Sequence, residues 1–135
     1  MKMLSIAVAC MFACAVASAD ATAAKSGQVL LKGKTRQGRA IRLTMNGNRL
    51  RLKRFAIALR CRSGGVLIDD ESGFVPSHLG HGGRVRDHQV GSTDDVWLRG
   101  RLHGRVLRGA VRVHDRWGRA QCDSGWVRFH ARARI

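Results

Sequence analysis

The chain has 135 residues and a formal net charge of +16, with 25 basic residues against nine acidic ones. This length suits one small domain rather than several, and no apolar run is long enough to cross a bilayer comfortably as a helix. A charge this large predicts polyanionic partners for an exported domain.

The first nineteen residues have the three parts of a secretory signal peptide. Lys2 forms a basic start, residues 4–16 form an apolar core, and Ala19 completes an A-x-A cleavage site. We therefore expect a periplasmic or secreted protein that is cleaved after Ala19 and has no transmembrane segment. Lipidation at Cys10 or Cys14 is the alternative, but neither cysteine is preceded by a convincing lipoprotein motif.

Cleavage would leave residues 20–26 as a flexible tether and residues 27–135 as a single β-domain. Residues 20–135 keep 24 basic residues, twenty of them Arg. A GC-rich genome also favours Arg, but it does not explain the shortage of acids. Cys61 and Cys122 most simply form one disulfide outside the cytoplasm. Two free thiols or half a metal site are the alternatives.

Residues 41–53 alternate between apolar and polar side chains, which predicts two strands. Asn46-Gly47 lies between the two runs and is typical of a type I′ hairpin turn. The register that follows from this turn gives the hairpin one apolar face. It also places Arg42 opposite Arg51, and like charges so paired destabilise a sheet unless an anion or an acidic side chain lies between them.

After Lys53 the apolar positions change from even to odd numbers, which predicts a bulge or a sharp bend. Further alternating runs cover residues 96–103 and 127–135. Gly100 and Gly109 interrupt strand-like runs, as glycines do at bulges and barrel corners. We expect an all-β fold, either a small antiparallel β-sandwich or a partly open β-barrel, with one disulfide and one long acidic loop.

The expected loop is residues 69–95, which hold six of the nine acids and the only proline. Loops of this length are usually functional or disordered, and a short strand at Phe74-Val75 is compatible with it. If the loop ends meet, their carboxylates converge and, with His78, His81 and His88, become candidate metal ligands. We favour the simpler interpretation that these acids neutralise nearby Arg side chains, and we expect no cofactor.

Asp123-Ser124-Gly125 is the tripeptide found around the nucleophile of trypsin-like proteases. That chemistry also needs a positioned histidine, a buried aspartate and an oxyanion hole, and here Cys122 and Trp126 replace the flanking glycines. We therefore expect a disulfide-anchored turn and no enzyme, with Trp126 in the core. Trp97 lies among arginines, where it either stacks on sugars or bases or takes cation–π contacts from its neighbours.

Two stretches on either side of a strand ending at Cys61 carry a resemblance. They are Gly33-Lys34-Thr35-x-Gln37-Gly38-Arg39 and Cys122-Asp123-Ser124-Gly125-x-Val127-Arg128-Phe129. Together they resemble a family of small secreted bacterial one-disulfide, Arg-rich β-domains of uncharacterised function. The resemblance implies the β fold and the disulfide, and it supplies no active-site residues.

Charge and alternation together predict an exported, non-enzymatic domain that binds a polyanion through Arg-rich sheet faces. The ligand classes are lipopolysaccharide or another envelope phosphate, acidic polysaccharide, and nucleic acid. A structural or interaction module of the cell envelope with an acidic protein partner is the alternative, in which the acidic loop can also act as an internal counter-charge. The expected contacts lie on the polar side of the strands: Arg42, Arg49, Arg51, Arg99, Arg101, Arg112, Arg128, Arg132, Arg134 and Trp97.

Overall fold

The computed structural model describes residues 27–116 and 121–134, so the predicted signal peptide and tether lie outside the described residues. The described chain is nearly all β-strand, as the alternation predicts. In chain order the strands are β1 (Gln28–Thr35), β2 (Ala40–Asn46), β3 (Arg49–Cys61), β4 (Val66–Ser72), β5 (Ser77–His78), β6 (Arg84–Val90), β7 (Asp94–His103), β8 (Val106–Asp115), β9 (Cys122–Asp123) and β10 (Val127–Arg134). One turn of 3-10 helix, η2 (His81–Gly83), precedes β6.

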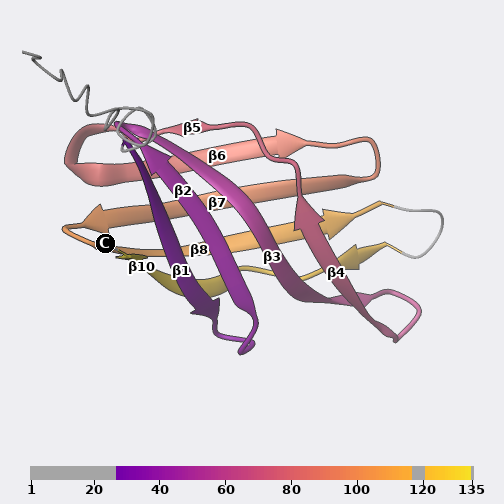
Figure 1. Ribbon diagram of the computed structural model, residues 1–135. Coiled ribbons are helices and arrows are strands. Elements are labelled where there is room, and N and C mark those ends of the chain that lie inside the picture. Colours follow the sequence, from indigo (N-terminus) through magenta and orange to yellow (C-terminus); the bar gives the residue numbers. More distant parts are fainter. Residues whose placement is uncertain (1–26, 117–120, 135) are drawn as a thin grey trace, which may run out of the picture.

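The strands form an antiparallel sheet that closes into a six-strand barrel (Figure 1). The order around the barrel is β10-β1-β2-β3-β9-β8, and pairing of β8 with β10 closes it. β7 and β6 extend the sheet beyond β8, while β4 and β5 pair with β3. In Figure 1, β6, β7 and β8 run across the direction of β1, β2 and β3. The predicted all-β fold is confirmed.

Buried side chains from both sets of crossing strands make up the core. The largest fully buried ones are Phe55, Leu31, Ile41, Leu43, Leu50, Ile57, Leu59, Leu107, Val111 and Val113. Full burial of one such side chain contributes about 1.5–3 kcal/mol. Because these residues occupy alternate positions of β1, β2, β3 and β8, the opposite face of each strand is left to polar and basic residues.

The β2–β3 hairpin forms at the predicted place but has a different turn. Asn46 pairs with Arg49, so the two turn residues are Gly47 and Asn48. Gly47 has a φ of 59°, whereas φ is not positive at Asn48. A glycine with positive φ at the first turn position fits type II′ rather than the predicted type I′.

This turn changes which charges face each other. Arg51 lies opposite Thr44, so the predicted Arg42–Arg51 pair is wrong. Arg42 instead lies opposite Arg54. A carboxylate compensates this second pair, because Arg54 forms a bidentate ion pair with Asp70. The sheet thus meets the requirement for an acidic side chain at a like-charged pair.

The predicted irregularity after Lys53 is a bulge. The β2–β3 register shifts between Arg42 and Leu43, which leaves Lys53 as an extra residue on β3. Leu52 before it and Phe55 after it are both buried, although one position is even and the other odd. Because Lys53 is unpaired, the buried side chains before it at even positions and after it at odd positions face the same inner side of the sheet.

Residues 69–95 are not the single long loop that composition predicted. They include most of β4, all of β5, η2 and β6, and the start of β7. The short strand forms at Ser77–His78 and not at Phe74-Val75. Phe74 instead stacks on Phe55, with ring centroids 5.8 Å apart. The alternation of β6 is weak in the sequence, because Val85 is its only buried side chain.

The disulfide joins β3 to β9. Cys61 and Cys122 lie directly opposite each other and are bonded, as predicted. They are separated by 61 residues in the sequence, and closing a loop of that size contributes on the order of 4 kcal/mol on chain-entropy arguments. The bond fixes the chain just before the last strand.

The side chain of Gln37 fills a gap in the barrel. β4 pairs with Ala58 on one edge of β3, but on the other edge Ala58 lies between the residues paired with β2 and those paired with β9 and has no strand neighbour. Gln37 Nε2 donates to the carbonyl oxygen of Ala58 at 3.1 Å, and Gln37 Oε1 accepts from the Ala58 N–H at 2.8 Å. One amide therefore replaces a residue of the missing strand.

Candidate functional site

The outer face of β6, β7 and β8 carries aligned arginines. Alternation directs Arg84 and Arg86 outward from β6, and Arg99 and Arg101 outward from β7. The register places Arg84 opposite Arg101, and Arg101 opposite Arg108 of β8. In the next row Arg86 lies opposite Arg99. Each of these pairings brings like charges together, which destabilises a sheet that lacks a counter-charge.

These side chains line a groove of about 1030 Å³. Six arginines define what we call the arginine groove: Arg84, Arg86, Arg99, Arg101, Arg108 and Arg128. His78 and Trp126 also line it, and none of its lining residues is acidic. Ala110 lies between Arg99 and Arg128 in their cross-strand row and is only 4% exposed, which places it at the bottom of the groove.

Two glycines allow β7 and β8 to approach closely beneath the groove. Gly100 and Gly109 pair directly with each other, and the register continues through them without a bulge. A Cβ on Gly109 would lie 2.2 Å from the carbonyl oxygen of Arg99 and 3.0 Å from the Cα of Gly100. No side chain larger than hydrogen fits at this cross-strand pair, so the glycines shape the floor of the groove.

The groove arginines have no carboxylate partner in the part of the chain that the structure describes. The ion pairs found there are Arg54–Asp70, Arg112–Asp123, His114–Asp123 and Arg116–Asp95. Within the groove, Arg101 Nε donates to the carbonyl oxygen of Gly82 at 3.3 Å, and Arg99 contacts an aromatic ring. Neither contact neutralises a charge.

A second hollow, of about 560 Å³, adjoins the groove. We call it the tryptophan hollow, and it is lined by Arg86, Asp87, His88, Trp97, Arg99 and Trp126. The prediction that Trp126 lies in the core is wrong, because this residue is 40% exposed. The guanidinium carbon of Arg99 lies 4.0 Å from the centroid of the Trp126 ring, a cation–π contact.

Trp97 forms the fixed wall of the tryptophan hollow. His88 of β6 stacks on it, with centroids 4.4 Å apart and planes 9° from parallel. The guanidinium of Arg112, from β8 on the other side, lies 5.3 Å from the ring centroid. Of the two interpretations of Trp97, contact with its own neighbours is therefore the one that the structure supports.

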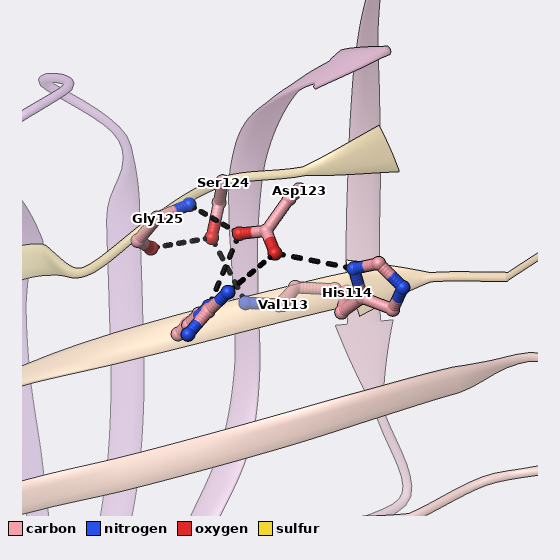
Figure 2. Close-up of polar contacts among 6 residues, drawn as sticks. Val113, His114, Asp123, Ser124 and Gly125 are labelled. Carbon is pink, nitrogen blue, oxygen red and sulfur yellow. Dashed lines mark hydrogen bonds and ion pairs between the residues drawn. The ribbon is translucent and has the colours of Figure 1, made fainter. Parts of the chain in front are cut away.

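Asp123 holds Arg112 in place beside Trp97, and Figure 2 shows the contacts of Asp123 with His114 and Gly125. Its oxygens accept hydrogen bonds from Arg112 Nη2 at 2.7 Å and Nε at 3.2 Å, and from the Gly125 N–H at 2.6 Å. His114 Nδ1 lies 3.1 Å from the same carboxylate. Burial alone would raise the pKa of Asp123, but these donors outweigh it and lower the pKa to about 2.

Ser124 has a structural role in the turn drawn in Figure 2. Its hydroxyl accepts a hydrogen bond from the Val113 N–H at 2.9 Å and donates one to the carbonyl oxygen of Gly125 at 2.7 Å. Neither bond involves His114, so the Asp-Ser-Gly tripeptide does not form the serine–histidine pair of a protease. The tripeptide forms the predicted disulfide-anchored turn.

The groove brings together three of the arginines predicted from sequence: Arg99, Arg101 and Arg128. Trp97 lies in the adjoining hollow, and Arg112 contacts it from behind. The other predicted contacts lie outside both hollows: Arg42, Arg49, Arg51, Arg132 and Arg134.

Sequence reasoning missed three groove arginines and also Trp126, which it placed in the core. Arg84 and Arg86 fell in the segment predicted to be a loop, and Arg108 was not selected. The alternation Arg84-Val85-Arg86 was a usable signal, but only the pairing of β6 with β7 shows which arginines these two residues face.

Carboxylates converge at the other end of β6 and β7, as predicted in part. Ligand oxygens of Asp69, Glu71 and Asp94 lie within 4.8 Å of one another. Glu71 is 8% exposed. Burial, then hydrogen bonds with Asp94 and Asp69, raise the pKa of Glu71 to about 9. The raised pKa favours the protonated form of Glu71, which reduces the repulsion among the three carboxylates.

Two other acids of this segment neutralise arginines, as the simpler interpretation predicts. Asp70 pairs with Arg54, and Asp95 lies 3.4 Å from Arg116. The candidate metal-binding histidines do not join the carboxylates. His78 lines the arginine groove and His88 stacks on Trp97, while His81 lies in η2. In the described ranges, no cluster of three or more potential metal ligands contains a histidine.

Comparison with known proteins finds no match to a family model and no match to a curated protein. The resemblance to small secreted one-disulfide β-domains stays a prediction. Within residues 27–116 and 121–134, no helix is long and apolar enough to cross a membrane.

Proposed function

We propose that this protein is an exported, non-enzymatic domain that binds a polyanion in the arginine groove. The observation that carries the proposal is the alignment of six arginines around one groove that no acidic residue lines. An anion in the groove would relieve the repulsion between aligned charges. Guanidinium groups suit this role because their planar forks hold phosphate or carboxylate through paired N–H donors.

The disulfide supports a place of action outside the cytoplasm. The polyanions to consider in the periplasm or outside the cell are lipopolysaccharide and other envelope phosphates, acidic polysaccharide, and nucleic acid. An acidic protein is the alternative ligand, because its carboxylates fit the same guanidinium forks. If the ligand is an acidic protein, polyglutamate should compete for the groove at least as well as polyphosphate.

Salt dependence tests the proposal. Each phosphate that is neutralised contributes about 0.7–0.9 to the slope of log affinity against log salt. Full use of six arginines therefore predicts a slope of about −4 to −5 for DNA or polyphosphate. The measurement is a titration against heparin, DNA, polyphosphate and lipopolysaccharide over a salt series. No binding at low salt, or affinity that is indifferent to salt, would contradict the proposal.

A matched pair of double variants distinguishes binding in the groove from a general effect of net charge. Arg101→Gln with Arg108→Gln removes two charges from the groove, whereas Arg49→Gln with Arg51→Gln removes two exposed charges outside it. The groove variant should reduce the salt slope by about 1.5–2 and weaken binding at least tenfold. The control should change affinity less than threefold. Equal losses in the two variants would mean that binding follows net charge and not the groove.

A further inference from the structure

We propose, building on the proposed function, that the polyanion is a single-stranded nucleic acid whose phosphates lie in the arginine groove while a base stacks on Trp126. The arginine groove and the tryptophan hollow share Arg86, Arg99 and Trp126. A phosphate in the first is therefore adjacent to a ring in the second. A cationic groove beside exposed aromatic side chains is the combination that binds single strands.

Trp126, and not Trp97, offers the stacking surface. The ring of Trp97 lies between His88 and Arg112, which reach it from the strands on either side. Trp126 has one described cationic neighbour over its ring, Arg99, and 40% of the residue is exposed. It also lines both hollows, so a base on its free surface stays connected to a backbone in the groove.

Arg99 links the two parts of the site. A guanidinium over an aromatic ring still has N–H donors that can bind an anion. The guanidinium carbon of Arg99 lies 4.0 Å from the centroid of the Trp126 ring, and Arg99 lines the groove as well. It can therefore hold the phosphate that belongs to the base on Trp126.

The lining of both hollows favours this ligand over a duplex, polyphosphate and lipopolysaccharide. A duplex keeps its base faces stacked inside the helix, whereas a single strand can present them. Polyphosphate has no ring to stack. The acyl chains of lipopolysaccharide need apolar surface, but the exposed apolar residues Val66, Leu67 and Ile68 of β4 lie outside both hollows.

One carboxylate, that of Asp87, lines the tryptophan hollow. Protein donors hold both of its oxygens: the Ser77 hydroxyl at 2.5 Å, the Gln89 amide at 2.8 Å and the His88 N–H at 2.8 Å. The negative charge is therefore tied to the wall of the hollow. This arrangement suits a base next to Asp87 and leaves the phosphates to the groove, which has no acidic lining residue.

The decisive test compares an oligodeoxythymidylate with an abasic oligomer of the same length and charge. The wild-type protein should bind the oligodeoxythymidylate on the order of tenfold more tightly, the contribution of one stacked base. Trp126→Leu should reduce that difference to less than threefold, because neither oligomer can then stack a base at this position. Trp126→Phe, which keeps a ring, should restore most of the affinity.

The outcomes separate this inference from the proposed function. Equal affinity for the two oligomers, with a steep salt slope, would overturn the stacking site and leave the groove proposal standing. No binding to either oligomer, to polyphosphate or to heparin would overturn both. Tighter binding of a hairpin duplex or of heparin than of the single strand would refute the ligand class.

A second variant tests Arg99 without removing its charge. Arg99→Lys keeps the cation but loses the planar fork and the stacked geometry. It should weaken binding of the oligodeoxythymidylate several-fold more than binding of polyphosphate. No loss with either probe would mean that Arg99 acts only as a charge, and an equal loss with both would mean that it binds phosphate independently of Trp126; either result would contradict the link between the two parts of the site. Thermal unfolding of each variant shows that the change is in binding and not in folding.

Discussion

Asp123 controls the geometry beside the groove through hydrogen bonds that it accepts. It orients Arg112 with two bonds, and Arg112 in turn covers Trp97. Asp123→Asn keeps the size of the side chain and removes the charge that these donors require. At neutral pH we expect a loss of about 1–3 kcal/mol in the free energy of unfolding, because charged donors lose their acceptor.

The same substitution has a defined pH dependence. The pKa of Asp123 is lowered from 3.8 to about 2, so its contribution to stability is present above pH 3.8 and is lost as the pH falls towards 2. The difference between wild type and Asp123→Asn should therefore shrink over that interval in urea unfolding. Asp70→Asn, at an exposed ion pair, is the control and should cost less. A difference that is constant with pH would refute this role of Asp123.

Glu71 predicts the opposite pH dependence. Its pKa is raised from 4.5 to about 9 by burial and by Asp94 and Asp69, so the folded chain holds a proton that the unfolded chain releases. The stability that depends on this proton is complete below pH 4.5 and is lost as the pH rises through about 9. Glu71→Gln mimics the protonated form. Tm of this variant should fall less than that of the wild type as the pH rises. At alkaline pH it should be several degrees higher than the wild-type Tm, since about 1 kcal/mol moves Tm by roughly 4 °C. An unchanged pH profile would contradict the raised pKa of Glu71.

At the scale of elements, the close approach of β7 and β8 at the Gly100–Gly109 pair shapes the groove. Gly109→Ala would place a methyl group 2.2 Å from the carbonyl oxygen of Arg99, so the two strands must separate. We expect a loss of more than about 2 kcal/mol in stability and weaker polyanion binding. Gly65→Ala is the matched control, because open space surrounds that position and its φ is not positive. It should be neutral or slightly stabilising. Equal stability of the two variants would show that β7 and β8 can move apart at this pair without cost, which would contradict the prediction.

Local alternation was sufficient to predict the elements whose partners are close in sequence. It placed the β2–β3 hairpin, and the parity change identified the bulge at Lys53. It missed the register of that hairpin, because Asn46-Gly47 and Gly47-Asn48 are both acceptable two-residue turns. A choice between them shifts every cross-strand pair, including the one that contains Arg42.

The groove itself could not be predicted from local pattern, because it depends on long-range pairing. Arg128 reaches it only because β10 pairs with β8, and Arg84 only because β6 pairs with β7. Composition also misled the prediction for residues 69–95. Their acids lie mainly on β4 and at the start of β7, while the arginines of β6 face the groove.

At the scale of the whole molecule, an acidic cluster lies apart from the arginine groove. Asp69, Glu71 and Asp94 gather together, whereas the arginine groove has no acidic lining residue. For the proposed polyanion, we expect the field of the groove to make association faster at low salt. The acidic segment therefore does not act as the internal counter-charge for the groove arginines.

The most direct test of the central claim is to map where a polyanion binds. The measurement is a titration of the isotopically labelled protein with polyphosphate, followed by the amide and Arg Nε–H NMR signals at a salt concentration that suppresses diffuse binding. The account predicts that the shifts concentrate on the six arginines of the groove, while Arg49 and Arg51 stay unchanged. Shifts of equal size at Arg49 and Arg51, or shifts spread evenly over all exposed arginines, would contradict a binding site in the arginine groove.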